Sequence, residues 1–278
     1  MSKGDFLLKD GRVTIKYLPR ISPDDNSYGE TYTERARSIG GYFRTKYASL
    51  KACEEQPAYF REQLIYNYLY KGPVLEWYLK IKTRLEKNYQ LFHELMPREG
   101  QILDLGCGYG FMSWLLHFAG PERNITGFDY DEEKIAVANH CFSRDEGIRF
   151  FEADISEIQL DSPDGIILAD SLHYLQPEKQ VLLLEQCMDR LNPGGVLVIR
   201  DGDRDLKERH KGTRRTEFFS TRLFGFNKTV HKKLFFLSGD SIREMATRRN
   251  MTCRTIDPSK YTSNLIFVIT HPAYDEKV

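Results

Sequence analysis

The sequence of 278 residues predicts an α/β protein, with a doubly wound, mostly parallel sheet that follows a helical N-terminal extension. After residue 100, short apolar runs alternate with helical stretches, which is the pattern of successive βαβ units. Runs such as 196–199 are apolar throughout, as expected of strands covered on both faces. Before residue 97 the apolar spacing is helical. We therefore predict an extension over 1–97 and a main domain over 98–278.

The N-terminal extension is expected to begin with a short strand and to continue as three helices. Residues 11–21 (GRVTIKYLPRI) alternate between polar and apolar types, as a strand does. From 28 to 97 the pattern is helical, with breaks at Pro57 and Gly72. The last helix should run over 73–96, because its apolar residues recur every three or four positions.

The main domain is predicted to contain seven strands, with helices beginning at Met112, Glu132, Pro177 and Ser241. The predicted strands are 102–105, 125–129, 148–154, 165–170, 196–201, 252–256 and 265–269. Right-handed crossovers place the C-terminal ends of parallel strands at one edge of the sheet, where we expect the functional site. The polar and aromatic stretch over about 201–236 is too long for a plain connection and is predicted to form a lid or a substrate wall.

Composition excludes several classes of protein. Forty basic residues balance forty acidic ones, so no overall field attracts a polyanion, and we expect no nucleic-acid partner. The five cysteines are scattered without a CxxC pair, which predicts reduced thiols and no metal site. No apolar run is long enough to cross a bilayer, and the first residues lack the apolar core of a signal peptide. We therefore expect a soluble, cytoplasmic protein.

The clearest motif is ILDLGCGYG at 102–110, an apolar strand containing Asp104 and followed by a glycine-rich turn. Its alternating glycines are Gly106, Gly108 and Gly110. Glycine lets a backbone turn sharply and approach a ligand closely. A dinucleotide fingerprint requires GxGxxG, whereas residue 111 is Phe, so the motif does not favour an NAD-dependent oxidoreductase.

This turn resembles motif I of class I S-adenosylmethionine (SAM)-dependent methyltransferases. Four later segments resemble the motifs of that family in the same order: GFDYD (127–131), FEADI (151–155), ADSLHYL (169–175) and LNPGGVLVIRD (191–201). The resemblance implies a Rossmann-like fold, methyltransferase activity, SAM as cofactor and S-adenosylhomocysteine (SAH) as product.

The same resemblance implies roles for particular residues. The glycine turn would hold the methionine moiety, Asp129 the ribose hydroxyls, Asp154 the adenine amino group and Ile155 the edge of the ring. A carboxylate suits the ribose because it accepts two hydrogen bonds at once. The cofactor-binding residues implied are Asp104, Gly106, Cys107, Gly108, Tyr109, Gly110, Asp129, Tyr130, Asp154, Ile155, Asp170 and Ser171. An N-terminal helix that closes over the cofactor would add Tyr70, Lys71 or Tyr78, unless these residues only pack in the core.

The flanking segments 66–82, 200–213 and 262–269 resemble the C-terminal methyltransferase module of bacterial fusion proteins that also carry an MMPL-type exporter and a lysophospholipid acyltransferase. Residues 13–25 resemble the acyltransferase tail. The chain would then be a fragment of such a fusion or a standalone relative, with peripheral membrane proximity through a fused or partner acyltransferase. We predict no acyltransferase activity, because the His-x4-Asp pattern occurs only from His140, inside a predicted helix. The oligomeric state is left open.

An oxygen acceptor can require little more than removal of its proton, so we expect a base close to the fourth strand. His173 is the first candidate, since an imidazole with a pKa near 6.5 suits proton transfer at neutral pH. His210 is the second. Alternatively, His173 only forms hydrogen bonds with the backbone at a helix start, and His210 only belongs to a run of charged residues that faces solvent. Asp201 is better suited to orient Arg200, Arg204 or a lid backbone group than to act as a base.

Arg200, Arg214 and Arg215 are predicted to bind the substrate, because guanidinium groups match carboxylate or phosphate. Phenylalanines in the lid suggest an acceptor with an apolar body. We therefore predict methyl transfer to a small-molecule acceptor, lipid-like or polyene-like, with O-methylation favoured over N or C. The alternative is a non-catalytic SAM-binding module that serves a partner enzyme.

Overall fold

The computed structural model describes residues 15, 17–86, 88–143, 145–206, 234–258 and 264–272. The chain divides into two compact units, Met1–Lys51 and Ala52–Val278. The first contains the short helix η1 (Asn26–Tyr28) and most of α1 (Tyr32–Glu54), which buries no side chain. The strand predicted over 11–21 is wrong for the described part of that segment, which pairs with no described strand. Alternation alone forms no strand without a hydrogen-bonded neighbour.

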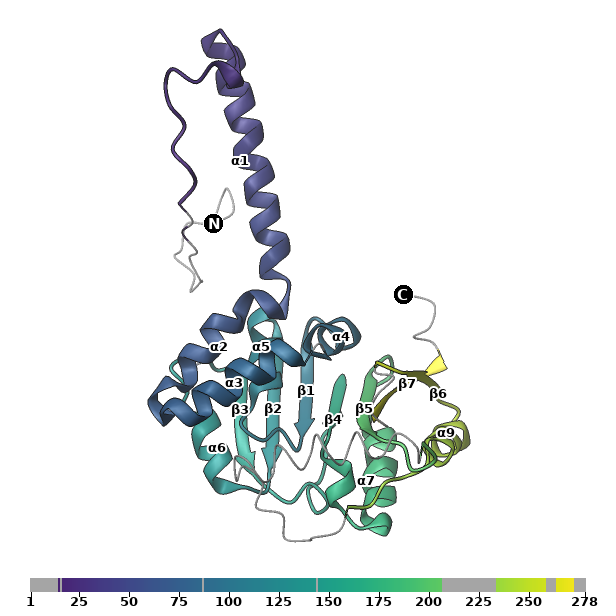
Figure 1. The fold of residues 1–278 in the computed structure, drawn as a ribbon. Coiled ribbons are helices and arrows are strands. Elements are labelled where there is room, and N and C mark those ends of the chain that lie inside the picture. The colour runs from purple at the N-terminus through teal and green to yellow at the C-terminus, as the bar shows by residue number, and fades with distance from the viewer. Residues whose placement is uncertain are drawn as a thin grey trace. The chain divides into compact units, whose positions relative to one another are not determined.

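The described strands of the second unit form one sheet of seven, in the order β3-β2-β1-β4-β5-β7-β6 (Figure 1). Their bounds are β1 (Gly100–Leu105), β2 (Arg123–Asp129), β3 (Ile148–Glu152), β4 (Gly165–Ala169), β5 (Val196–Gly202), β6 (Thr252–Ile256) and β7 (Asn264–Thr270). β7 runs antiparallel to β5 and β6, and the other pairs are parallel. The predicted fold class is therefore confirmed.

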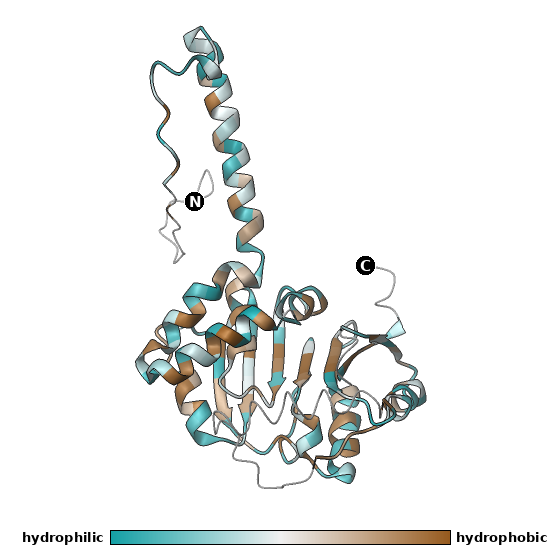
Figure 2. Cartoon of the chain, in the orientation of Figure 1, coloured by the Kyte–Doolittle hydropathy of each residue, from teal (hydrophilic) through white to brown (hydrophobic). Residues whose placement is uncertain are grey.

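Helices cover both faces of this sheet. They are η2 (Pro57–Phe60), α2 (Arg61–Tyr68), η3 (Leu69–Lys71), α3 (Pro73–Leu85), α4 (Asn88–Leu95), α5 (Phe111–Ala119), α6 (Glu132–Asn139), η4 (Leu172–Tyr174), α7 (Pro177–Arg190) and α9 (Gly239–Arg248). One apolar cluster lies beneath α2 to α6 and the other beneath α7 and α9. Alternate strand residues feed the two clusters: Ile167 joins the first and Ile166 the second. The strands are accordingly apolar along much of their length (Figure 2).

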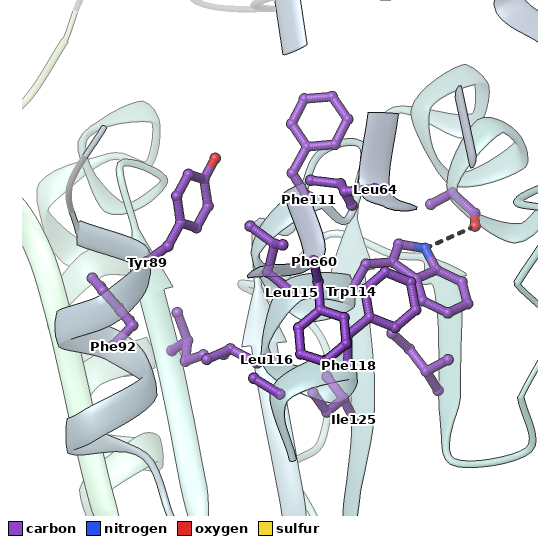
Figure 3. Close-up of a cluster of buried hydrophobic side chains, with 14 of the residues drawn as sticks. Phe60, Leu64, Tyr89, Phe92, Phe111, Trp114, Leu115, Leu116, Phe118 and Ile125 are labelled. Carbon is purple, nitrogen blue, oxygen red and sulfur yellow. Dashed lines mark hydrogen bonds between the residues drawn. The ribbon is translucent and has the colours of Figure 1, made fainter. Parts of the chain in front are cut away.

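Aromatic rings dominate the core between α5 and the N-terminal helices (Figure 3). Phe118 packs against Phe60 and Trp114, with ring centroids 5.8 and 5.4 Å apart. The Trp114 indole donates to the Ala138 carbonyl, 3.4 Å away, so the polar edge of this buried ring is satisfied. These contacts join η2 and α6 to α5.

The predicted helix over 73–96 is two helices, because the chain breaks at Glu86. The backbone of Glu86 is extended, with φ −85° and ψ 109°. Its carboxylate lies 3.3 Å from Lys82 Nζ and 3.4 Å from Arg200 Nη1. The helix α3 thus ends where Glu86 contacts Arg200 of β5, although the apolar spacing continues. Within the described residues no helix has the length and apolar character that crossing a bilayer requires.

Candidate functional site

The glycine turn after β1 is closed by two backbone hydrogen bonds from Gly106 and Cys107 to the Phe128 carbonyl, at 2.7 and 2.9 Å. All three glycines of the motif have positive φ. A Cβ at Gly106 would lie 2.3 Å from the Cβ of Ser171, so protein packing requires glycine there.

The other two glycines differ from one another in what surrounds them. A Cβ at Gly110 would lie 2.6 Å from the Phe150 ring, again a packing constraint. At Gly108 no described atom lies within 4 Å of that position. The backbone of Gly108 therefore faces open space, which is what a loop that approaches a ligand requires.

Asp129 ends β2 beside this turn, and backbone amides hold both of its carboxylate oxygens. Gly108 N donates to Oδ2 at 2.8 Å, and Asp131 N donates to Oδ1 at 3.0 Å. Asp131 in turn begins α6 by accepting from the amides of Glu133 and Lys134. Each oxygen of Asp129 retains a further lone pair, so the carboxylate is oriented and can still accept from a ligand.

Asp154 follows β3 and is fixed locally. Its Oδ1 accepts from the amide and the hydroxyl of Ser156, at 2.9 and 2.6 Å. Burial opposes ionisation of Asp154, but the Ser156 hydrogen bonds and the Lys179 charge outweigh it and hold the pKa below its usual value. Ile155, the next residue, is buried.

Two partly exposed aromatic rings lie near the ends of β2 and β3. Tyr130 and Phe151 are 41% and 48% exposed, and Phe151 stacks on Phe128 with ring centroids 5.9 Å apart. Exposed ring faces next to Asp129 and Asp154 suit a nucleoside, which needs hydrogen bonds at its sugar and an apolar surface for its base.

Asp104 lies beneath the glycine turn and is only 2% exposed. Burial raises the pKa of its carboxyl to about 6, although a hydrogen bond from Ser113 Oγ opposes the shift and the Asp129 charge adds to it. Asp104 therefore joins β1 to α5 through Ser113.

The N-terminal helices reach the turn through Tyr68, which the sequence interpretation did not single out. Tyr68 Oη donates to the Tyr109 carbonyl at 2.5 Å. Tyr70 instead donates to the Val137 carbonyl, and Lys71 pairs with Glu133. Because Tyr66, Tyr68 and Tyr70 alternate in the sequence, no local signal distinguishes the one that contacts the turn.

Asp170 and Ser171 follow β4 at the edge shared with β5. Asp170 has a φ of 55°, and its carboxylate accepts from Arg200 Nη1 and, at 3.3 Å, from Asn264 Nδ2. Ser171 Oγ donates to the Leu105 carbonyl at 2.8 Å. Asp170 therefore ties this edge to β5 and β7, while Ser171 ties it to β1.

His173 lies in η4 and forms a buried pair with Asp201 of β5. Its Nδ1 is 2.6 Å from Asp201 Oδ1, and its amide donates to Oδ2 at 3.0 Å. Its ring packs on Phe236, with centroids 5.3 Å apart. Asp201 thus orients His173 and also accepts from the adjacent Gly202 amide, while Arg200 contacts Asp170 and Glu86. That Asp201 also orients Arg204 or a lid backbone group stays a prediction.

The structure thus brings some of the predicted site residues together. The glycine turn, Asp129, Asp154 and the β4–β5 edge lie at the C-terminal ends of parallel strands (Figure 1). His210, Arg214 and Arg215 lie outside the described residues. Among the residues that the structure does describe, no cluster of His, Cys, Asp or Glu could hold a metal ion.

The fold and this site agree with the resemblance to class I SAM-dependent methyltransferases. The features that agree are the antiparallel β7, the glycine turn after β1 and the oriented acid at the end of β2. Residues 102–195 match the family described as a methyltransferase domain. SAM fits this chain, because the open face of Gly108 and the oriented Asp129 provide the contacts that its methionine and ribose parts need.

One relative is the carboxy-S-adenosyl-L-methionine synthase of Aeromonas hydrophila, which is 29% identical over 108 residues, or 37% of this chain and 43% of the relative. The chain spans less than half of the length of the curated relatives it matches.

Among solved structures, a SAM-dependent methyltransferase from Mesorhizobium loti aligns with a TM-score of 0.52 at 17% identity, covering 67% of this chain and 98% of that one. Human N-acetylserotonin methyltransferase in complex with SAM aligns with a TM-score of 0.50 at 20% identity, covering 73% and 57%. At these identities the likeness shows the fold alone.

Proposed function

We propose that this protein transfers a methyl group from SAM to a small-molecule acceptor. The observation that carries the proposal is the Asp129 carboxylate, which two backbone amides hold beside the open face of Gly108. Bound SAM would supply the methyl group on an activated sulfonium. The protein then has to bind the cofactor, orient the acceptor and exclude water.

The described residues support cofactor binding at four places. Gly108 lets the backbone approach the methionine part, Asp129 accepts from the ribose, and Asp154 with the amide of Ile155 reads the adenine. Tyr68 fixes the glycine turn by donating to the Tyr109 carbonyl. Gly108, Asp129 and Asp154 have hydrogen-bond partners that orient them before a ligand arrives, which reduces the free energy lost on binding.

For the proton of a hydroxyl acceptor, we propose His173 as the base. Asp201 holds its Nδ1, which fixes the ring orientation and would stabilise the protonated imidazole. His173 is only 1% exposed, and the rings of Tyr174 and Phe236 pack on it, so an acceptor would reach it only after surrounding side chains move. The alternative base, His210, stays a prediction.

The nature of the acceptor is the least constrained part of this function. Four statements stay predictions from the sequence. They are that the acceptor has a lipid-like or polyene-like body, that the methyl group goes to oxygen, that Arg214 and Arg215 bind the acceptor, and that a fused or partner acyltransferase brings the protein close to a membrane. The cytoplasmic location also stays a prediction.

The function is tested by incubating the protein with methyl-labelled SAM and fractionated bacterial extract, and by following label into lipid, small-molecule and protein fractions. Label in a small-molecule or lipid fraction supports the proposal. SAM binding without any transfer would instead favour the non-catalytic module. His173→Gln should abolish transfer while SAH affinity is kept, and His140→Gln, at an exposed position, is the matched control.

A further inference from the structure

A cluster of paired charges lies at the C-terminal end of β5, where α3 and α4 meet the sheet. Arg200 Nη1 contacts both Glu86 and Asp170, and Lys82 pairs with Glu86 at 3.3 Å. The side chains of Arg200 and Glu86 are each only 16% exposed. Two cations therefore face two carboxylates, and the cluster carries no net charge.

Three hydrogen-bonding atoms in and beside this cluster have no partner among the described residues. They are Tyr89 Oη, Arg200 Nε and Asn264 Oδ1, and all three are buried. Leaving such an atom unsatisfied is unfavourable, and native proteins rarely do so unless water or a ligand supplies the partner. Each of the three atoms can therefore still form a hydrogen bond with a polar group of a ligand.

Tyr89 gives the clearest indication, because its ring belongs to the apolar core while its hydroxyl does not. The residue is 6% exposed, and the hydroxyl points away from the apolar cluster that holds the ring (Figure 3). Burial raises the pKa of Tyr89 well above its usual value, as does the neighbouring charge of Glu86, while Lys82 and Arg200 oppose the shift. The hydroxyl is thus neutral, and it is close enough to Glu86, Lys82 and Arg200 for their charges to affect it.

The unpartnered atoms define the chemistry of a group that could pair with them. Arg200 Nε can only donate, the Tyr89 hydroxyl can donate or accept, and Asn264 Oδ1 can only accept. The Asn264 amide is oriented by its Nδ2, which donates to Asp170. A hydroxyl both donates and accepts, whereas a carboxylate only accepts and would add an unpaired charge to a balanced cluster.

We propose that this cluster binds a neutral hydroxyl group of the methyl acceptor, such as a phenol or an alcohol, and rejects carboxylates and phosphates. The proposal rests on the proposed function in taking the ligand to be the methyl acceptor. Its place fits, because ligands of open α/β sheets bind beyond the C-terminal ends of the strands. In this cluster Arg200 acts as a hydrogen-bond donor whose positive charge is balanced by Glu86 and Asp170.

Three probes of matched shape distinguish the possibilities: phenol, benzoate and phenyl phosphate. Their binding is followed by saturation-transfer NMR at millimolar concentration, with and without SAH. Phenol should bind wild-type protein more tightly than either anion. Tyr89→Phe, which removes only the hydroxyl, should weaken phenol binding by about fivefold. Tyr66→Phe is the matched control, because Tyr66 is 57% exposed and belongs to neither site.

A second variant tests the charge argument. Glu86→Gln leaves the cluster with one excess positive charge, so the ratio of benzoate to phenol affinity should rise by about fivefold or more, whereas Glu62→Gln, at an exposed position, should not change it. Tighter binding of an anion by wild type, no saturation transfer to phenol, or no effect of Tyr89→Phe would each overturn the proposal. SAH affinity, measured separately by calorimetry, reports folding and the proposed function, so the two failures are distinguishable.

Discussion

The amide of Gly108 donates a hydrogen bond to the carboxylate of Asp129, with 2.8 Å between N and Oδ2. This bond joins the glycine turn after β1 to the end of β2, two segments that are 21 residues apart. It makes the carboxylate part of the same rigid unit as the loop that faces open space. Cofactor binding should therefore depend on both residues together.

Replacing Asp129 tests that unit directly. Asp129→Ala removes the ribose acceptor and also leaves the Gly108 amide without its partner, so SAH affinity should fall by about 10- to 100-fold, as expected for hydrogen bonds to a charged group. Calorimetric titration with SAH measures the change. Glu132→Ala removes a nearby exposed carboxylate and should leave affinity as it is. Equal affinity in both variants would contradict the placement of the ribose.

The three glycines should respond differently to alanine. Gly106→Ala and Gly110→Ala place a methyl group 2.3 and 2.6 Å from neighbouring protein atoms, so both should lower thermal stability and SAH binding together. Gly108→Ala meets no described atom and carries only the left-handed backbone penalty, about 1 to 2 kcal/mol. Gly108→Ala should therefore lower SAH affinity more than its small loss of thermal stability would explain. Thermal unfolding with and without SAH separates the two effects, and a uniform response would contradict the open face.

The sheet could be predicted from the sequence because its signals are local. The apolar runs of β1 to β5 are bounded by polar residues, and the acid that begins α6, Asp131, directly precedes the helix. The break at Glu86 had no such signal in the apolar spacing, and the Arg200 that Glu86 contacts there is 114 residues away in the sequence. Apolar spacing therefore predicted one helix where there are two.

The site shows the same division between local and distant signals. The glycine turn, Asp129 and Asp154 were proposed because they lie in short segments that resemble the motifs of one family. The pairing of His173 with Asp201 joins the ends of two strands, and only the fold brings these two residues together. The sequence pattern did not single out Tyr89, which looked like one more apolar position of a helix. No local signal distinguishes a tyrosine that only packs in the core from one whose hydroxyl can also bind a ligand.

A second buried histidine should make stability depend on pH. Arg123 Nη1 donates to His93 Nδ1 at 2.9 Å, and burial, with the Arg123 and Arg98 charges, lowers the pKa of His93 to about 3. The unfolded chain binds a proton near pH 6.5 and the folded protein does not, so stability falls as pH decreases from 6.5 toward 3. At pH 5 the loss should be about 2 kcal/mol.

Urea unfolding at pH 5 and pH 7 measures this loss as a difference between wild type and His93→Gln. The variant has no imidazole to protonate in the unfolded chain, so its stability should change less between the two pH values. His140→Gln should keep the wild-type dependence, because His140 is exposed. An identical pH dependence in wild type and His93→Gln would show that His93 is not held neutral by its neighbours.

Asp104 should change stability with pH in the direction opposite to that of His93. Burial raises the pKa of its carboxyl to about 6, against an unfolded value near 3.8, so its contribution to stability is fully present at low pH and is lost as pH rises through 6. Asp104→Asn removes this ionisation, and the variant without cofactor should gain up to about 3 kcal/mol relative to wild type between pH 4 and pH 8. Urea unfolding at the two pH values measures the gain. Asp161→Asn, at an exposed carboxylate, should show none. A constant difference between Asp104→Asn and wild type would mean that Asp104 ionises alike in the folded and unfolded chain.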